Sequence, residues 1–254
     1  MKNIEKLVNK LSVYVKAIFR ATSIDSPEFI GCGFLLKEGD NIFLITAAHV
    51  FDYNNNNSSP LYSYNNNGKF IPIQGKAITN KTAQPKLRKD DEDDFAVIWL
   101  NKDATAAFQE TPALGLNDLD LNCEANHDYG YIVIGYPHST NKKSIDCDSK
   151  FVDPIIYGFK SSEKTDSFYN TYNIKKDSHI AIHFNKKEVY SDTQKKITAP
   201  DLNGMSGTPI WGFTGGSEKI VAILTDHVKR EKKVVLGRRV NDIRSWLNDL
   251  LNAD

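Results

Sequence analysis

The sequence predicts an all-β fold of two six-stranded antiparallel β-barrels followed by a C-terminal helix. Short runs rich in Val, Ile, Phe and Tyr recur along the chain and are separated by turn-forming residues. Helical periodicity is scarce before the last segment. The length of 254 residues also fits a single large all-β unit.

The candidate strands suffice for two six-stranded halves within one domain of residues 1–254. We expect the first barrel over 13–105 and the second over 128–240, joined by a loop-rich connection at 101–128. The polar tracts 54–57 and 65–68 predict an exposed loop, because runs of Asn favour turns. The strands are expected at 13–20, 29–36, 42–47, 70–79, 95–100, 131–136, 153–160, 179–184, 208–213, 220–225 and 233–240.

The last segment, 241–252, predicts an amphipathic helix. Ile243, Trp246, Leu247 and Leu250 recur at helical spacing, and Asn or Asp precedes them as a cap. We expect its apolar face to pack against the second barrel.

Composition restricts the partners and the compartment. Thirty-two basic residues balance thirty-two acidic ones, which gives no global electrostatic reason to bind nucleic acid or an anionic membrane. No apolar run approaches the roughly 20 residues that span a bilayer, and the N-terminus lacks the pattern of a secretory signal. Three cysteines without C-x-x-C spacing predict a reducing, cytoplasmic setting, with Cys32 as a small buried apolar residue.

The strongest chemical signal is the segment Gly204-Met205-Ser206-Gly207-Thr208-Pro209. Gly204 allows an unusual backbone dihedral and Gly207 leaves room for a substrate carbonyl. The N–H groups of Gly204 and Ser206 can then form an oxyanion hole, in which each donor is worth roughly 2.7 to 4 kcal/mol. The pattern predicts that Ser206 is a nucleophile presented by a tight turn.

A serine hydroxyl needs a base, and the base needs an acceptor that holds its tautomer. His49 ends the apolar run Ile42-Phe43-Leu44-Ile45-Thr46-Ala47-Ala48, so a strand would aim its ring. Asp94 is the last acid before the next apolar run and is the expected partner of His49. Asp93 remains the alternative, because strand boundaries read from sequence are uncertain by a few residues.

These three motifs resemble those of the trypsin-like, chymotrypsin-fold serine peptidases, particularly the bacterial trypsin-like peptidase domains. The resemblance covers the chain from about Val13 to its end. It implies two barrels with the triad of His49, Asp94 and Ser206 between them. It also implies a serine endopeptidase that needs no metal or cofactor and acts on a protein or peptide substrate.

The resemblance further implies that Thr225, Asp226 and His227 form the edge to which a substrate strand adds. Asp201 would line the primary pocket and favour a basic residue. His227 and Val235 instead favour a small or acidic residue, so the two indications conflict. Met205 stands where many relatives place an acid that pairs with a freshly cut N-terminus, which removes that route of activation.

Two alternatives remain open. The chain is either a peptidase, with a dedicated protein target or regulator encoded nearby as in bacterial defence systems, or a catalytically silent module of the same fold that binds peptides or acts as a sensor. His179 and His183 have the spacing of metal ligands on a helix. Their surroundings predict a strand, and a structural role is expected.

Overall fold

The computed structural model describes residues 2–21, 27–57, 60–79, 93–125, 128, 130–141, 145–146, 151–152, 154–185, 189–191, 196–197, 202–214, 216–227 and 233–252. The first half contains α1 (Lys2–Ser12), β1 (Val15–Ala21), β2 (Pro27–Glu38), β3 (Asn41–Thr46), α2 (Ala48–Asn57), β4 (Leu61–Tyr64), β5 (Phe70–Pro72), β6 (Gly75–Thr79), β7 (Ala96–Leu100), α3 (Lys102–Phe108) and the 3-10 helix η2 (Leu116–Asp118). The second half contains β8 (Tyr131–Gly135), α4 (His138–Asn141), β9 (Ile145–Asp146), β10 (Phe151–Val152), β11 (Tyr157–Ser161), α5 (Asp166–Tyr172), β12 (His179–His183), β13 (Val189–Ser191), β14 (Lys196–Ile197), β15 (Pro209–Thr214), β16 (Ser217–His227), β17 (Val234–Arg239) and α6 (Ile243–Leu251).

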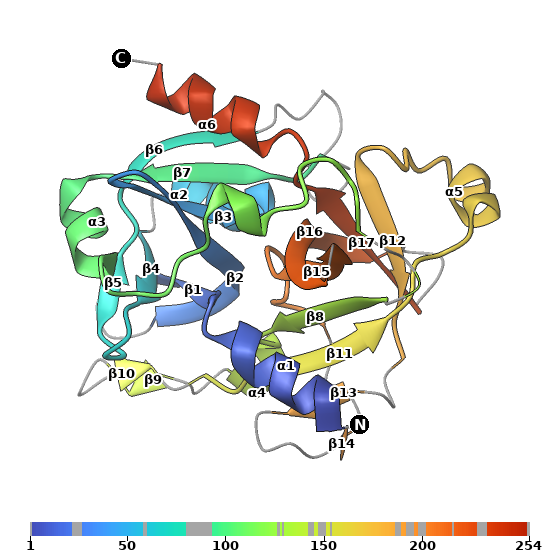
Figure 1. Ribbon diagram of the computed structural model, residues 1–254. Coiled ribbons are helices and arrows are strands. Elements are labelled where there is room, and N and C mark those ends of the chain that lie inside the picture. Colours follow the sequence, from blue (N-terminus) through green and yellow to red (C-terminus); the bar gives the residue numbers. More distant parts are fainter. Residues whose placement is uncertain are drawn as a thin grey trace.

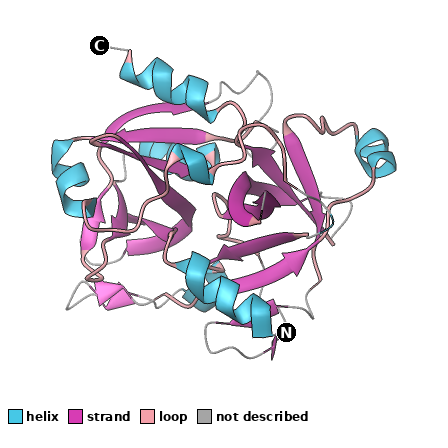
Figure 2. Ribbon diagram, viewed as in Figure 1, coloured by secondary structure: helices cyan, strands magenta, loops and turns pink. Residues whose placement is uncertain are grey.

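Two curled antiparallel sheets confirm the predicted all-β, chymotrypsin-like two-barrel architecture. The first sheet has the order β5-β4-β1-β2-β3-β7-β6, and the second has the order β12-β17-β16-β15-β8-β11-β13-β14. The two sheets stand side by side in Figures 1 and 2, the first in blue to green and the second in green to red in Figure 1. Among the described residues they hold seven and eight strands rather than six each, because the expected strand 70–79 is two strands and β4, β13 and β14 add short ones.

The nonpolar side chains form a separate core inside each barrel and a larger core between the barrels. Ile18, Leu44 and Ile98 belong to the first interior, and Val133, Ile182 and Met205 to the second. Alternate residues of the same strands face the other sheet, as the two-residue period of a β-strand requires. The core between the barrels includes Val8, Phe19, Phe34, Ile132, Trp211 and Leu247.

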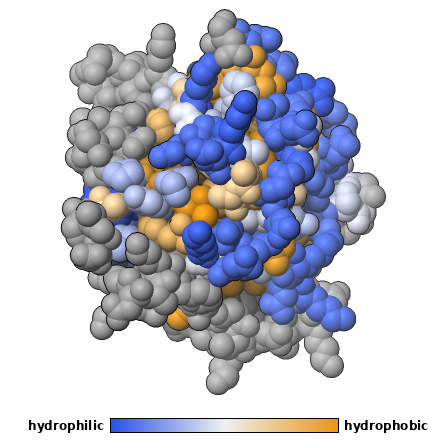
Figure 3. Space-filling view, turned by 90° about the vertical axis from the view of Figure 1, so that its left-hand side faces the viewer, coloured by the Kyte–Doolittle hydropathy of each residue, from blue (hydrophilic) through white to orange (hydrophobic). Residues whose placement is uncertain are grey.

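The outer face of the first barrel is visible in Figure 3. Hydrophilic side chains cover much of the described part of this face, with small apolar areas between them. Val13 and Ile155 are the exposed large hydrophobic residues of the described chain. No helix within the described ranges is both long enough and apolar enough to cross a membrane.

Several helices differ from the sequence-based expectation. The tract 54–57 lies in α2 rather than in a loop, and α3 lies within the connection expected to be loop-rich. The N-terminal helix α1 was not predicted, although Val8 and Leu11 are buried in the core between the barrels. In α1 and α3 the burial of nonpolar side chains outweighs weak local propensity.

The C-terminal helix α6 exists as predicted, but its partner differs. It lies across β6 and β7 of the first sheet, above them in Figure 1, and not against the second barrel as expected. The ring of Trp246 meets Phe95 edge-on, with centroids 5.0 Å apart. The helix follows the last strand of the second sheet and therefore ties the two barrels together.

Candidate active site

His49 and Asp94 are brought together by the segments that follow β3 and precede β7. The backbone N–H of His49 donates to Asp94 Oδ1 at 2.8 Å, and His49 Nδ1 lies 2.5 Å from Asp94 Oδ2. Asp94 is buried, and the side chain of His49 is 29% exposed. This geometry fixes the orientation of the imidazole through its Nδ1 nitrogen.

His49 lies at the second position of α2 rather than at the end of a strand. β3 ends at Thr46, and Ala47 connects it directly to the helix. The carbonyl of Ala47 accepts hydrogen bonds from the N–H groups of Val50 and Phe51. The side chain of His49 is therefore held by the rigid first turn of a helix whose residues Ala48 and Val50 are buried.

Asp93, the alternative acid, does not take the position beside His49. Its Oδ1 accepts a hydrogen bond from Arg238 Nε at 3.1 Å. Of the two neighbouring carboxylates, Asp94 is the one that contacts the imidazole.

Ser206 lies in a turn shaped by glycines with positive φ. Gly204 has φ +89° and Gly207 has φ +86°, both in the region that favours glycine. The N–H groups of Met205, Gly207 and Thr208 donate to the carbonyls of Leu202, Leu224 and Met205. Within the described part of the chain, no carbonyl accepts a hydrogen bond from the N–H of Gly204 or Ser206.

The turn that carries Ser206 is held against β2 of the first sheet. The N–H of Cys32 donates to the carbonyl of Ser206 at 2.8 Å, and Cys32 Sγ lies 3.3 Å from the carbonyl oxygen of Gly204. Thr46 Oγ1 donates to the carbonyl of Cys32 at 2.6 Å. Cys32 was expected only as a buried apolar residue, and its burial is confirmed, but its backbone also joins the two barrels at the serine turn.

The histidine helix and the serine turn meet at Gly31. A Cβ built on Gly31 would lie 2.6 Å from Val50 Cγ2 and 3.2 Å from the carbonyl oxygen of Ser206. Only a residue without a side chain fits between these two groups. The residue that follows His49 and the carbonyl of Ser206 therefore both lie against Gly31 of β2.

Thr225 is the one predicted substrate-contacting residue whose side chain is described. Its carbonyl accepts a hydrogen bond from Ser206 Oγ at 3.4 Å, and the register of β16 with β17 shifts between Leu224 and Asp226. The backbone of Asp226 and His227 continues β16, paired to Leu236 and Val235, but their side chains lie outside the description. Asp201 also lies outside the described residues.

Met205, beside the serine, points into the second barrel. Its side chain is 1% exposed and belongs to the core that contains Val133 and Leu224. A Cβ on Gly135 would approach Met205 Cε to 3.0 Å. The serine turn is thus anchored by an apolar side chain and not by an ion pair at this position.

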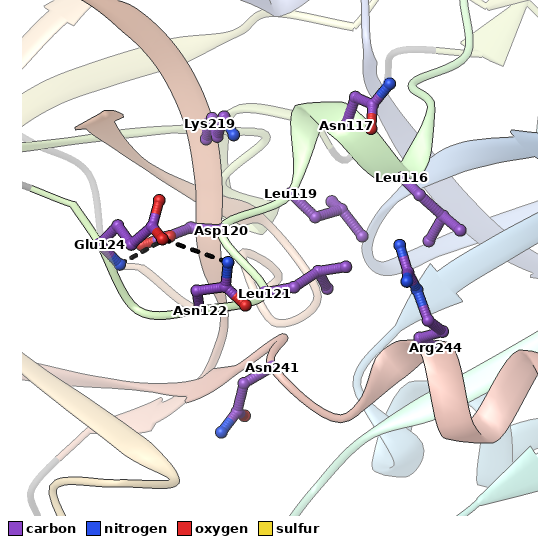
Figure 4. Close-up of a pocket in the computed structure, with 10 residues that line it drawn as sticks. All are labelled: Leu116, Asn117, Leu119, Asp120, Leu121, Asn122, Glu124, Lys219, Asn241 and Arg244. Carbon is purple, nitrogen blue, oxygen red and sulfur yellow. Dashed lines mark hydrogen bonds between the residues drawn. The ribbon is translucent and has the colours of Figure 1, made fainter. Parts of the chain in front are cut away.

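A hollow of about 370 Å³ lies apart from Ser206, where the connection between the sheets meets α6 (Figure 4). Lys219 of β16 lines it, six residues before Thr225, which corresponds to about 20 Å along a strand. The buried carboxylate of Asp120 already accepts from the N–H groups of Glu124 and Ala125. Leu116, Asn117, Leu119, Leu121, Asn122, Asn241 and Arg244 complete the lining.

The two histidines with metal-ligand spacing lie on β12. His179 is buried and its Nδ1 lies 2.8 Å from Ser178 Oγ, whereas His183 is exposed. Within the described ranges, no three His, Cys, Asp or Glu residues are grouped so as to hold a metal ion.

Comparisons with known proteins show the fold alone. No protein-family model and no curated protein matches the sequence. The chain is similar to a solved chymotrypsin-fold serine protease titled "Structure of GrC", with a TM-score of 0.56, 17% sequence identity and 94% of each chain covered.

Proposed function

We propose that this protein is a serine endopeptidase in which Ser206 is the nucleophile, His49 the general base and Asp94 the acid that orients the base. The observation that carries the proposal is the contact of His49 Nδ1 with Asp94 Oδ2 at 2.5 Å, combined with a serine turn of the second barrel that is bonded to Cys32 of β2. Both elements are needed for acyl transfer, and each comes from a different sheet.

The proposed reaction begins when the Ser206 hydroxyl turns from the Thr225 carbonyl toward His49 Nε2. His49 takes the hydroxyl proton while Oγ attacks the carbonyl carbon of the peptide bond. The N–H groups of Gly204 and Ser206 stabilise the oxyanion, and His49 then gives the proton to the leaving amine. Water, activated by the same imidazole, hydrolyses the acyl-enzyme.

The proposed substrate is an extended peptide that adds to β16 at Thr225, Asp226 and His227. Within the described residues, pairing on the β15 side of β16 ends at Leu224, whose N–H donates to the carbonyl of Thr208. The next residues are paired to β17 on the other side alone, so main-chain groups remain for a substrate strand. Asp201 is proposed to determine which residue is accepted just before the cleaved bond. Cleavage of a peptide library tests this, because Asp201 should favour a basic residue at that position.

The proposal extends to how the enzyme is regulated and to where in the cell it acts. Burial of Met205 supports an enzyme that does not depend on a new N-terminus pairing with an acid at this position. We propose that the peptidase is cytoplasmic and bacterial, and that a dedicated protein target or regulator is encoded nearby.

Labelling with a fluorophosphonate tests the nucleophile. We expect the wild-type protein to react at Ser206 and the Ser206→Ala variant not to react. Asp94→Asn should lower the rate by about 10⁴-fold, because the imidazole loses its acceptor. Ser217→Ala is the matched control, since Ser217 is an exposed serine whose hydroxyl bonds the Thr214 carbonyl, and it should label like the wild type.

Each contrary outcome has a clear meaning. Labelling that survives Ser206→Ala refutes the assigned nucleophile. A folded wild-type protein that is inert to the reagent but binds peptides would support the silent peptide-binding module instead.

A further inference from the structure

Arg238 connects the second barrel to the segment that carries Asp94. It lies on β17, and its Nε donates to Asp93 Oδ1 at 3.1 Å. Asp93 directly precedes Asp94, which approaches His49 from the first sheet. The bond therefore crosses between the barrels one residue away from the carboxylate that contacts the imidazole.

The guanidinium of Arg238 is itself held on several sides. Its second terminal nitrogen donates to Asp242 Oδ2 at 2.6 Å, and its first donates to the carbonyls of Ser178 at 3.3 Å and Arg239 at 2.9 Å. The side chain is 9% exposed. A planar, always charged group fixed in this way holds Asp93 with little further loss of rotamer freedom.

The other neighbour of Asp94 is anchored to the same part of the chain. Phe95 is buried and its ring meets Trp246 of α6 edge-on at an interplanar angle of 84°. Asp93 and Phe95, one on each side of Asp94, are thus fixed by β17 and by the helix that follows it. An exposed ion pair alone contributes little to stability, but this one lies one residue away from the buried carboxylate of Asp94.

We propose that Arg238 and Trp246 are positioning residues that hold the Asp94 carboxylate against His49, so that the acid from the first barrel is aligned by the second. This inference rests on the proposed peptidase function. Its consequence is that the His49–Asp94 pair is correctly formed only when the β17–α6 segment is docked.

The test measures the rate of fluorophosphonate labelling of Ser206 as a function of pH. The Asp93 side chain is 59% exposed, so Asp93→Asn should fold. We expect its plateau rate to fall about 10- to 100-fold, the scale of a displaced catalytic group. The rise of rate with pH should also move to lower pH, because a misaligned Asp94 stabilises the imidazolium less.

The charged groups around His49 define the controls. Asp94 contacts it, and Asp93, the residue before Asp94, bonds Arg238, which also bonds Asp242. Asp52 lies three residues further along α2. Asp166→Asn removes an exposed carboxylate of the second barrel that pairs with Lys176 and not with Arg238, and its plateau rate should stay within about twofold of the wild type. Asp93→Glu keeps a carboxylate for Arg238 and should recover part of the rate lost in Asp93→Asn.

In Arg238→Gln, the direction in which the pH profile of the labelling rate shifts distinguishes loss of alignment from loss of a nearby positive charge. Loss of a nearby positive charge alone would stabilise the imidazolium and move the profile to higher pH. Loss of alignment moves it to lower pH and lowers the plateau, as we expect. If Arg238→Gln does not fold, Trp246→Leu provides the second variant, with the same expected loss of rate.

Two outcomes overturn the inference for different reasons. If the wild type labels at Ser206 while Asp93→Asn, Arg238→Gln and Trp246→Leu keep its plateau and profile, Arg238 and Trp246 are structural only. If the folded wild type does not label at all, the proposed function fails and this inference fails with it.

Discussion

At the scale of single residues, two glycines with nearly the same backbone conformation differ in what surrounds them. Gly207 has φ +86° and Gly216 has φ +87°. A Cβ on Gly207 would lie 1.9 Å from the carbonyl oxygen of Cys32 and 2.5 Å from Thr46 Oγ1, whereas a Cβ on Gly216 meets nothing within 4 Å. Comparing alanine substitutions at these two glycines separates the free-energy cost of backbone strain from the cost of a steric clash.

We expect Gly216→Ala to lower the free energy of unfolding by about 1 kcal/mol, the cost of a positive φ for an L-residue. Gly207→Ala should cost clearly more than this, because β2 must also move away from the serine turn. It should slow fluorophosphonate labelling, whereas Gly216→Ala should not. Denaturant unfolding and labelling rates measure both effects, and equal losses of stability would show that the serine turn is not packed against Cys32 as described.

Residues whose role depends on a distant partner could not be assigned from sequence. Ser206, His49 and Asp94 stand out because each sits at the edge of an apolar run or between glycines. In the sequence, Arg238 is visible only as a charged residue within an expected strand. Its bond to Asp93 joins residues 145 positions apart. A local pattern carries no information about such a contact.

At the scale of elements, α5 is attached to the second barrel by a buried polar cluster around Glu163. Tyr169 of α5 donates its hydroxyl proton to Glu163 Oε1 at 2.6 Å, Tyr131 of β8 donates to Oε2 at 3.1 Å, and Arg239 of β17 lies 3.4 Å from Oε1. Burial, followed by the charge of Glu163, raises the pKa of Tyr131. Burial and the hydrogen bond to Glu163 raise the pKa of Tyr169, so both phenols remain donors.

We expect Glu163→Gln to lower the free energy of unfolding by about 3 to 5 kcal/mol, because it leaves the Arg239 charge buried without its carboxylate. Both side chains are 6% exposed. Asp166→Asn is the matched control in the same segment, since the Asp166 side chain is 77% exposed in its pair with Lys176, and it should change stability far less than Glu163→Gln does. Chemical unfolding compares the two, and similar small effects would contradict a structural role for the cluster.

The strands were more predictable than the helices for a physical reason. A strand that is buried on both faces shows as a continuous apolar run, as in β3, β7 and β8. The helix α1 exposes Lys6 and Lys10 and buries Val8 and Leu11, so its signal is short and interrupted. The presence of α6 was readable from its spacing, but its position over β6 and β7 follows from how the barrels dock.

At the scale of the whole molecule, Lys16 makes stability depend on pH. It lies on β1 with 4% of its surface exposed, and its Nζ is 5.4 Å from the centre of the Tyr64 ring. Burial lowers the pKa of Lys16 from 10.5 to about 8. An ammonium group in this position is separated from water, and this desolvation disfavours its charged form. Its described neighbour is the face of an aromatic ring.

The sign of the pH effect follows from proton binding. Between pH 8 and 10.5 the unfolded chain holds a proton on Lys16 that the folded chain has released, so stability from this group rises with pH. Below pH 8 both states are protonated, and the folded protein bears the full penalty of about 3 kcal/mol.

Lys16→Met should therefore stabilise the protein most at pH 7, and its advantage over the wild type should shrink as the pH approaches 10. Lys37→Met, which removes an exposed lysine of β2, controls for net charge. Urea unfolding of the three proteins between pH 7 and 10 measures the difference, and a constant gap between Lys16→Met and the wild type would contradict a desolvated Lys16 in the folded protein.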